Sequence, residues 1–292
     1  MMRSPQAMAI AVRRPSGEVV VKEEPWRSIW RRFKFLRWPF LRGGVVFAEA
    51  LINGLQALTF SANEALAEEK DGGPLSPWAM AGTIGLALSL GILVFVVAPH
   101  VLTIFLGRIF DSGFGVRSFW FHAIDGLIKV IFFVAYIGGI SLIKDVRRVF
   151  MYHGAEHMGI HAYEHGEDLT VANARRHPTL HPRCGTAFLL LVLVISIGFF
   201  AAAFPLLPKP AESAWLSNAF YILVKIALMP AIAGVAYEIT RLAGRHPDNP
   251  WVRPVIWPGL MLQKLTTRPP TDDQIEIALT AIRCALKIEE AA

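Results

Sequence analysis

The sequence predicts a mainly α-helical membrane protein: a polytopic bundle of about four transmembrane helices plus an interfacial helix. Hydrophobic residues make up 54% of the 292 residues, more than in an average soluble domain. Four apolar stretches are each longer than the roughly 20 residues that cross a bilayer core. Arginines and lysines gather at the ends of these stretches, as expected beside an anionic lipid surface.

The N-terminal 42 residues carry two predicted elements. Residues 7–24 alternate around a Pro-Ser-Gly turn, which predicts a small cytoplasmic β-hairpin. Residues 26–42 alternate aromatic rings with arginines and lysines, which is typical of a membrane-surface anchor. Residues 43–65 follow as an apolar helix with polar interruptions, which we interpret as interfacial or re-entrant. The interruptions are Glu49, Asn53 and Gln56.

The four predicted spans are 78–106, 118–143, 186–207 and 215–240. Basic residues crowd the connection between the second and third spans, and they are scarce in the connections at 107–117 and 208–214. The positive-inside rule therefore places both termini and the 144–185 segment in the cytoplasm. A fifth span at 43–65 would place this basic segment outside, which argues against it.

The C-terminal segment predicts a cytoplasmic amphipathic helix. Thr271 and Gln274 form a capping-box pattern at its start. Apolar residues then recur on one face, at Ile275, Leu279, Ile282 and Leu286. The chain thus divides into five regions: 1–42, 43–143, 144–185, 186–244 and 245–292.

Charge and cysteine content exclude other classes. The net charge of +6 suits a lipid surface, and no basic-aromatic motif of a nucleic-acid-binding type occurs. Cys184 and Cys284 are far apart and form no disulfide framework, so we expect a reducing compartment. The first 42 residues do not have the pattern of a cleavable signal peptide.

The segment "YHGAEHMGIHAYEHG", residues 152–166, carries a histidine at every fourth position: His153, His157, His161 and His165. On an α-helix, residues four apart drift by only about 40° around the axis, so the first three would form one stripe. Two histidines at this spacing can bind one metal ion.

The stretch "HGAEH" matches the H-x-x-E-H order of inverzincins. In that arrangement His153 and His157 bind a divalent transition metal, most readily zinc, and Glu156 is the general base. Glu164 is the nearest candidate for a third ligand. The following "HPTLHPRCG" adds His181 and Cys184 as further candidates.

Other interpretations of these residues remain open. A closed four-ligand structural zinc site fits the same inventory. The histidines could instead be solvated on a polar helix or could sense pH. Cys184 as a nucleophile is the weaker alternative to Cys184 as a ligand, because the sequence around it carries no catalytic signature.

The second span contains charged residues. Asp125 and Lys129 are four apart and predict an ion pair on one face, which either fixes helix packing or lines a polar path. Lys225 in the fourth span fits both interpretations.

The stretch "VRRVFMYHGAEHMGIHAYEHGEDLTVANARRHPTLHPRCGTAFLLL" resembles the core of the YqhQ-like family of bacterial membrane proteins of unknown function. The similarity extends to "MMRSPQAMAIAVRRPSGEVVV", "VAYEITRLAG" and "PGLMLQKLTTRPPTDDQIEIAL", and thus to nearly the whole chain. The matching site residues are His153, Glu156, His157, Glu164, His181, Arg183 and Cys184. Met158 and Ala172 depart from the family pattern. Family members usually have a Gly-rich stretch before the Met-Met-Arg-Ser block, so we expect the natural chain to begin upstream.

The resemblance carries the label of a predicted metal-dependent enzyme, which agrees with the motif. The resemblance to bacterial membrane proteins implies a multi-pass protein of the bacterial inner membrane. The leading hypothesis is a metal-dependent hydrolase at the cytoplasmic surface of that membrane, acting on a lipid-linked or peptide substrate. The rival is a non-catalytic partner of a translocon, a membrane protease or another membrane complex, with a purely structural metal. A metal transporter ranks last, because the histidines lie outside the spans.

Overall fold

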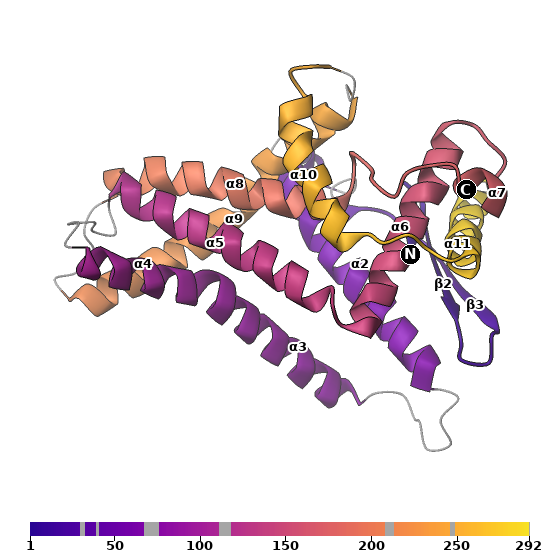
Figure 1. The fold of residues 1–292 in the computed structure, drawn as a ribbon, viewed down its shortest axis with the longest axis horizontal. Helices are drawn as coiled ribbons and strands as arrows, with labels where there is room; N and C mark the ends of the chain where they lie inside the picture. The colour runs from indigo at the N-terminus through magenta and orange to yellow at the C-terminus, as the bar shows by residue number, and fades with distance from the viewer. Residues whose placement is uncertain are drawn as a thin grey trace.

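The computed structural model describes residues 1–29, 33–38, 41–66, 76–110, 118–207, 213–245 and 249–291. Long helices form one elongated part of the molecule (Figure 1). A small sheet and further helices gather at the other end, where both ends of the chain also lie. The fold is therefore mainly α-helical, as the composition predicts.

The N-terminal sheet has three antiparallel strands in the order β1-β2-β3: Met2–Arg3, Ala7–Arg13 and Val19–Pro25. The predicted hairpin is confirmed, with Met8 opposite Glu24 and a turn in which Gly17 has a φ of 93°. Strand β1 was not predicted, because two residues are too short to show alternation. Of the predicted surface anchor 26–42, residues 30–32 and 39–40 lie outside the described residues; a short 3-10 turn, η1, covers Lys34–Arg37.

Among the described residues, five helices are long and apolar enough to cross a membrane: Leu41–Ala65, Trp78–Ile109, Phe119–Ile140, Gly185–Leu206 and Trp215–Arg245. The last four are the predicted spans. The first of these four spans combines α3 (Pro77–Ile92), the π-helical turn η2 (Leu93–Val97) and α4 (Ala98–Ile109). The second is α5 (Phe119–Ile140), and the third is α8 (Gly185–Ala203) with the short turn η3 (Phe204–Leu206). The fourth is α9 (Ala214–Arg245).

The remaining candidate is α2 (Leu41–Leu66), which covers the helix predicted to be interfacial. Its length and composition allow it to cross a membrane, and its interfacial placement stays a prediction. Arg42 near its start forms a two-pronged ion pair with Glu238 of α9, with Nε to Oε1 at 2.5 Å. The first and last candidate spans are thus joined directly.

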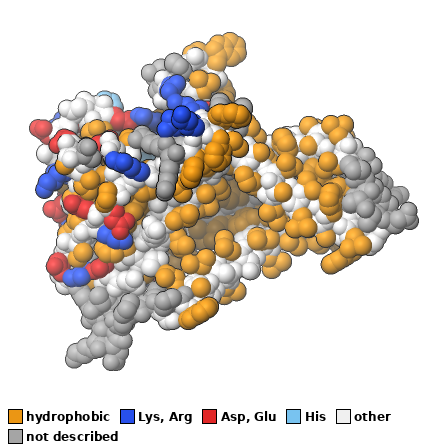
Figure 2. Space-filling view, turned by 180° about the vertical axis from the view of Figure 1, so that it is seen from behind, with side chains coloured by type: hydrophobic (Ala, Val, Ile, Leu, Met, Phe, Trp, Pro, Cys, Tyr) orange, Lys and Arg blue, Asp and Glu red, His pale blue; other side chains and the backbone are white. Residues whose placement is uncertain are grey.

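Apolar side chains cover the long helices. Figure 2 shows hydrophobic residues over this part and charged residues gathered at the opposite end. Leu86 and Leu88 of α3 are 72% and 63% exposed, an arrangement that suits contact with lipid rather than water. Inside, α8 packs on α9 through Phe200, Phe204 and Tyr221. The chain is therefore a multi-pass membrane protein.

The polar end of the molecule combines α6 (Lys144–Glu164), α7 (Val171–Ala174) and α11 (Asp272–Glu290) with the sheet. The capping box of α11 is confirmed, and its apolar stripe packs on α6 and β2. Helix α10 (Arg253–Thr266) was not predicted, because Pro254 and Pro258 interrupt its pattern. It leads into the segment that crosses α6 at the histidines.

The predicted pair of α5 is also confirmed. Lys129 Nζ lies 2.7 Å from Asp125 Oδ2, and Lys225 Nζ of α9 lies 2.6 Å from the same oxygen. All three side chains are buried. One carboxylate oxygen thus contacts the side-chain nitrogens of two lysines inside the apolar helices.

Candidate metal centre

Helix α6 places the predicted histidines on one side. His153, His157 and His161 follow each other at single-turn spacing and face the 177–184 loop and the start of α8. Two glycines let neighbouring segments approach closely. A Cβ at Gly154 would collide with the carbonyl oxygen of Arg268, and one at Gly159 would lie 2.7 Å from Ile282 Cδ1. The histidine helix is therefore packed tightly against α11 and the segment that follows α10.

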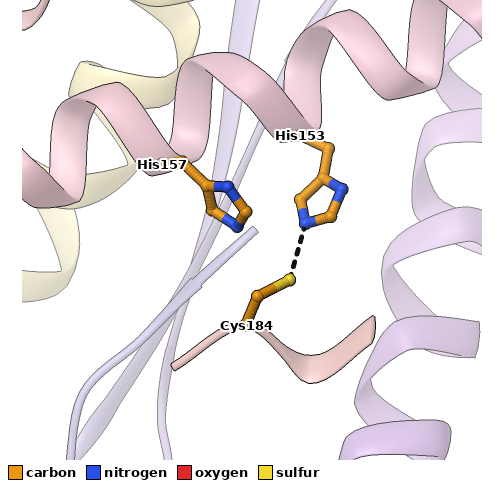
Figure 3. A group of neighbouring side chains, drawn as sticks. All are labelled: His153, His157 and Cys184. Carbon is orange, nitrogen blue, oxygen red and sulfur yellow. Dashed lines mark hydrogen bonds between the residues drawn. The ribbon is translucent and has the colours of Figure 1, made fainter. Parts of the chain in front are cut away.

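His153, His157 and Cys184 form the first candidate ligand group. Their ligand atoms all lie within 4.8 Å of one another, and His153 Nε2 is 3.2 Å from Cys184 Sγ. Figure 3 shows the two imidazoles pointing from α6 toward the sulfur. Cys184 is the N-cap residue of α8, so the group connects α6 to the first turn of a membrane span.

Backbone carbonyls orient both imidazoles of this group. His153 Nδ1 lies 2.8 Å from the oxygen of Thr266, and His157 Nδ1 lies 2.6 Å from the oxygen of Thr179. A carbonyl can only accept, so both Nδ1 atoms carry a proton and donate it. Each Nε2 is then the atom available to a metal ion, as in many metal sites, where metal-binding histidines donate their other N–H to a backbone carbonyl or carboxylate. Two nitrogens and one sulfur in this arrangement match the donors that zinc takes.

His161, Glu164 and His181 form a second group beside the first. His161 donates from Nε2 to the oxygen of Leu180 at 2.9 Å. His181 Nδ1 accepts the N–H of Arg183 at 3.2 Å, so its Nε2 carries the proton that faces Glu164 Oε2 at 3.3 Å. Glu164 also binds the guanidinium of Arg183. This group is already satisfied by internal hydrogen bonds.

The structure therefore divides the five predicted ligands. His153, His157 and Cys184 lie together, whereas Glu164 and His181 lie with His161. His161 was not among the predicted ligands, although it follows His157 at the same four-residue spacing that identified His153 and His157 as candidates. Gln263 of α10 was not among the predicted site residues. Its Oε1 accepts a hydrogen bond from the backbone N–H of His181 at 2.7 Å, and its Nε2 donates one to the backbone oxygen of His181 at 2.9 Å.

Glu156, the predicted general base, lines the same cavity as the first group. This cavity has a volume of about 340 Å³ and is also lined by Glu164, His181 and Arg183. The Glu156 carboxylate lies 2.6 Å from the amine of Met1. A second cavity of about 900 Å³ also reaches His153 and Glu156, and its further walls come from α2, α6, α11 and the β2–β3 turn.

The titration of Cys184 and His153 is coupled. Burial alone would raise the pKa of the Cys184 thiol, but hydrogen bonds and charges from His153 and His157 lower it to about 5. Burial alone would lower the pKa of His153, but the contact with Cys184 raises it to about 9. In the metal-free protein a thiolate therefore faces an imidazolium. A metal ion bound here would take the place of the proton between them.

The second group titrates differently. Burial lowers the pKa of His181 to about 4, and burial also lowers the pKa of His161. Both imidazoles are therefore neutral at pH 7. They add polar hydrogen-bonding groups to the wall of the cavity without adding charge.

Comparison with known proteins identifies the family of the chain. Residues 38–288 match the family described as "Protein of unknown function (DUF1385)". The "Uncharacterized protein YqhQ" of Bacillus subtilis (strain 168) is 32% identical, over 96% of this chain and 86% of the relative. No solved structure matches. The chain belongs to the DUF1385 family, whose YqhQ-like members it resembles in sequence.

Proposed function

We propose that this protein is a metal-dependent hydrolase of the cytoplasmic membrane surface, with one zinc ion bound by His153, His157 and Cys184. The observation that carries the proposal is the pair of hydrogen bonds from the Nδ1 atoms to the oxygens of Thr266 and Thr179, which leave both Nε2 atoms near Sγ. The third ligand is then Cys184, rather than Glu164 or His181. The positive-inside pattern of the sequence supports the cytoplasmic placement.

Three protein ligands would leave a fourth position open, and a zinc ion held there would supply a water whose pKa is lowered toward about 7. Glu156 lies on the cavity wall beside the ligands, where its carboxylate is suited to take a proton from that water. Arg183 lies on the same wall, where Glu164 holds its guanidinium. The larger cavity between α2 and α6 offers a route for a substrate that stays partly in the membrane.

Elemental analysis of the purified chain tests metal binding. We expect about one zinc per chain in the wild type and in Glu156→Gln, and loss of zinc in His157→Ala. Thermal unfolding of each variant controls for misfolding. A wild-type protein without stoichiometric transition metal, or His157→Ala that keeps its metal, refutes the proposal.

A second experiment separates a catalytic site from the rival non-catalytic role. The rival has its own support, because the ligand group ties α6 to the N-cap of α8 and could serve only to hold them together. We expect the absorption spectrum of the Co²⁺-substituted protein to change when acetohydroxamate is added, because an open fourth position accepts it. A spectrum that does not change indicates a closed, structural site and favours a partner of a membrane complex.

A further inference from the structure

A cluster of ionisable side chains lies inside the apolar helices, apart from the metal centre. Asp125 and Lys129 belong to α5, Lys225 to α9 and His100 to α4. His100, Asp125 and Lys225 are 2%, 1% and 3% exposed. Neither of the two cavities at the metal centre is lined by these residues. The proposed hydrolysis therefore makes no use of them.

The depth of the cluster follows from the helix bounds. Asp125 is six residues into α5, and Lys225 is ten residues after Trp215 at the start of its span. At 1.5 Å per residue these positions lie roughly 9 Å and 15 Å along their helices, inside a hydrocarbon core about 30 Å thick. α5 ends at Ile140, close to α6, so the cluster lies toward the end of the bundle opposite the metal centre.

The contacts of the cluster do not balance its charge. Asp125 Oδ2 accepts hydrogen bonds from both Lys129 and Lys225, while Oδ1 is buried with no hydrogen-bond partner among the described residues. Full ionisation places two positive charges against one negative charge. An uncompensated charge in an apolar interior is costly, and proteins commonly avoid it by changing protonation.

The surroundings of Lys225 add no anion. The rings of Phe121, Phe200 and Phe204 lie around its Nζ, each centroid 5.8 Å away. His100 Nδ1 lies 3.4 Å from the same nitrogen, and His100 Nε2 is buried without a partner in the described part of the chain. His122 of α5 packs against Phe121 and Phe204. Among the described residues, Asp125 is the one carboxylate that forms an ion pair with either lysine.

We propose that Asp125, Lys129, Lys225 and His100 form a proton-binding centre within the membrane-spanning helices. With all three side chains ionised, Asp125 would face two ammonium groups. The centre instead lacks one of the lysine protons, so that one ammonium group balances the carboxylate and the other amine is neutral. Uptake of one proton converts this amine to an ammonium and leaves the centre with one excess positive charge. The ligand is the proton, and its binding is a property of the whole group and cannot be assigned to one residue.

The variants Lys129→Met and Lys225→Met test the charge count, because each leaves one carboxylate with one ammonium. Lys144→Met is the matched control, since Lys144 is exposed at the start of α6. Between about pH 5 and pH 9, the wild-type and control proteins should lose stability as the pH falls, because the unfolded chain binds a proton that the folded centre lacks. One linked proton changes the ratio of folded to unfolded protein by about tenfold per pH unit. Lys129→Met and Lys225→Met should each lack this contribution, so the pH dependence of their stability should be weaker than that of the control by one linked proton.

A direct measurement covers the case in which a variant does not fold. In wild-type protein labelled with ¹³C at the lysine Cε, one resonance assigned to the cluster should move between its neutral and charged positions over the same pH range. The proposal is overturned if both lysines stay charged throughout. It is also overturned if thermal stability depends on chloride instead of pH, since a bound anion would then balance the charge. Neither result affects the zinc content, so the metal proposal is tested separately.

Discussion

Replacing Gly154 by alanine tests whether the hydrogen bond behind His153 controls metal binding. Gly154 lies where the segment after α10 crosses α6, and a Cβ there would meet the carbonyl oxygen of Arg268 far inside contact distance. Thr179 Cγ2 would lie 3.3 Å away on the other side. The Arg268 N–H binds the oxygen of Phe150 at 2.9 Å, so the crossing segment is attached to α6 at this point.

The structure sets the size of the effect. An ordinary contact of a Cβ begins near 3.4 Å, so the crossing segment must move by about 1 Å to make room. The same movement would stretch the 2.8 Å bond between His153 Nδ1 and the Thr266 oxygen beyond hydrogen-bonding range. Loss of such a partner lowers metal affinity by about 10- to 100-fold. Overpacking also reduces stability by about 1–3 kcal/mol.

The assay is zinc affinity, measured by competition with a chromophoric chelator. Gly185→Ala is the matched control, because Gly185 follows Cys184 directly and its Cβ would meet open space. We expect weaker binding in Gly154→Ala and unchanged binding in Gly185→Ala. If Gly154→Ala binds zinc as tightly as the wild type, the carbonyl bond does not control the site and the reasoning is refuted. An equal loss in both variants would show that any added methyl group disturbs the site.

Three further predictions concern other parts of the chain. Asp125→Asn removes the carboxylate and leaves a buried ammonium group without a counter-ion. The substitution should therefore reduce the free energy of unfolding, measured by denaturation in detergent, by about 3–5 kcal/mol. In the metal-free protein, alkylation of Cys184 by iodoacetamide should keep its rate as the pH falls from about 8 to 6, because the thiol protonates only near its pKa of about 5. Burial raises the pKa of Cys284, so the alkylation rate of Cys284 should fall steeply over the same pH range, and this cysteine serves as the internal control. Thr271→Ala removes the cap of α11 and should cost about 1 kcal/mol, seen as faster amide exchange in its first turn; unchanged exchange would contradict the role of the cap.

Periodic features of the sequence were predicted well. The apolar spans, the alternating hairpin and the capping box at Thr271 depend on local spacing, and each is present in the structure. The four-residue spacing of the histidines likewise predicted their stripe on α6. These features follow from helix and strand geometry, which a sequence displays directly.

The division of the ligands could not be predicted from spacing. Successive histidines drift by about 40°, so His153 and His161 face different neighbours even though both lie on the stripe. Which neighbour each meets depends on how the 177–184 loop returns to α6, and α10 fixes that path through Gln263. Helix α10 also leads to Thr266, whose oxygen orients His153. Long-range contacts of this kind leave no periodic signal.

The ion pair between Arg42 and Glu238 has a consequence for biosynthesis. Its two members are 196 residues apart in the chain. At about 5–20 residues per second, the ribosome needs roughly 10–40 s to make the second partner after the first. During that interval α2 has left the ribosome without the helix it packs against. Completion of the tertiary structure must therefore wait until translation is nearly finished, and chains truncated before α9 cannot form this contact.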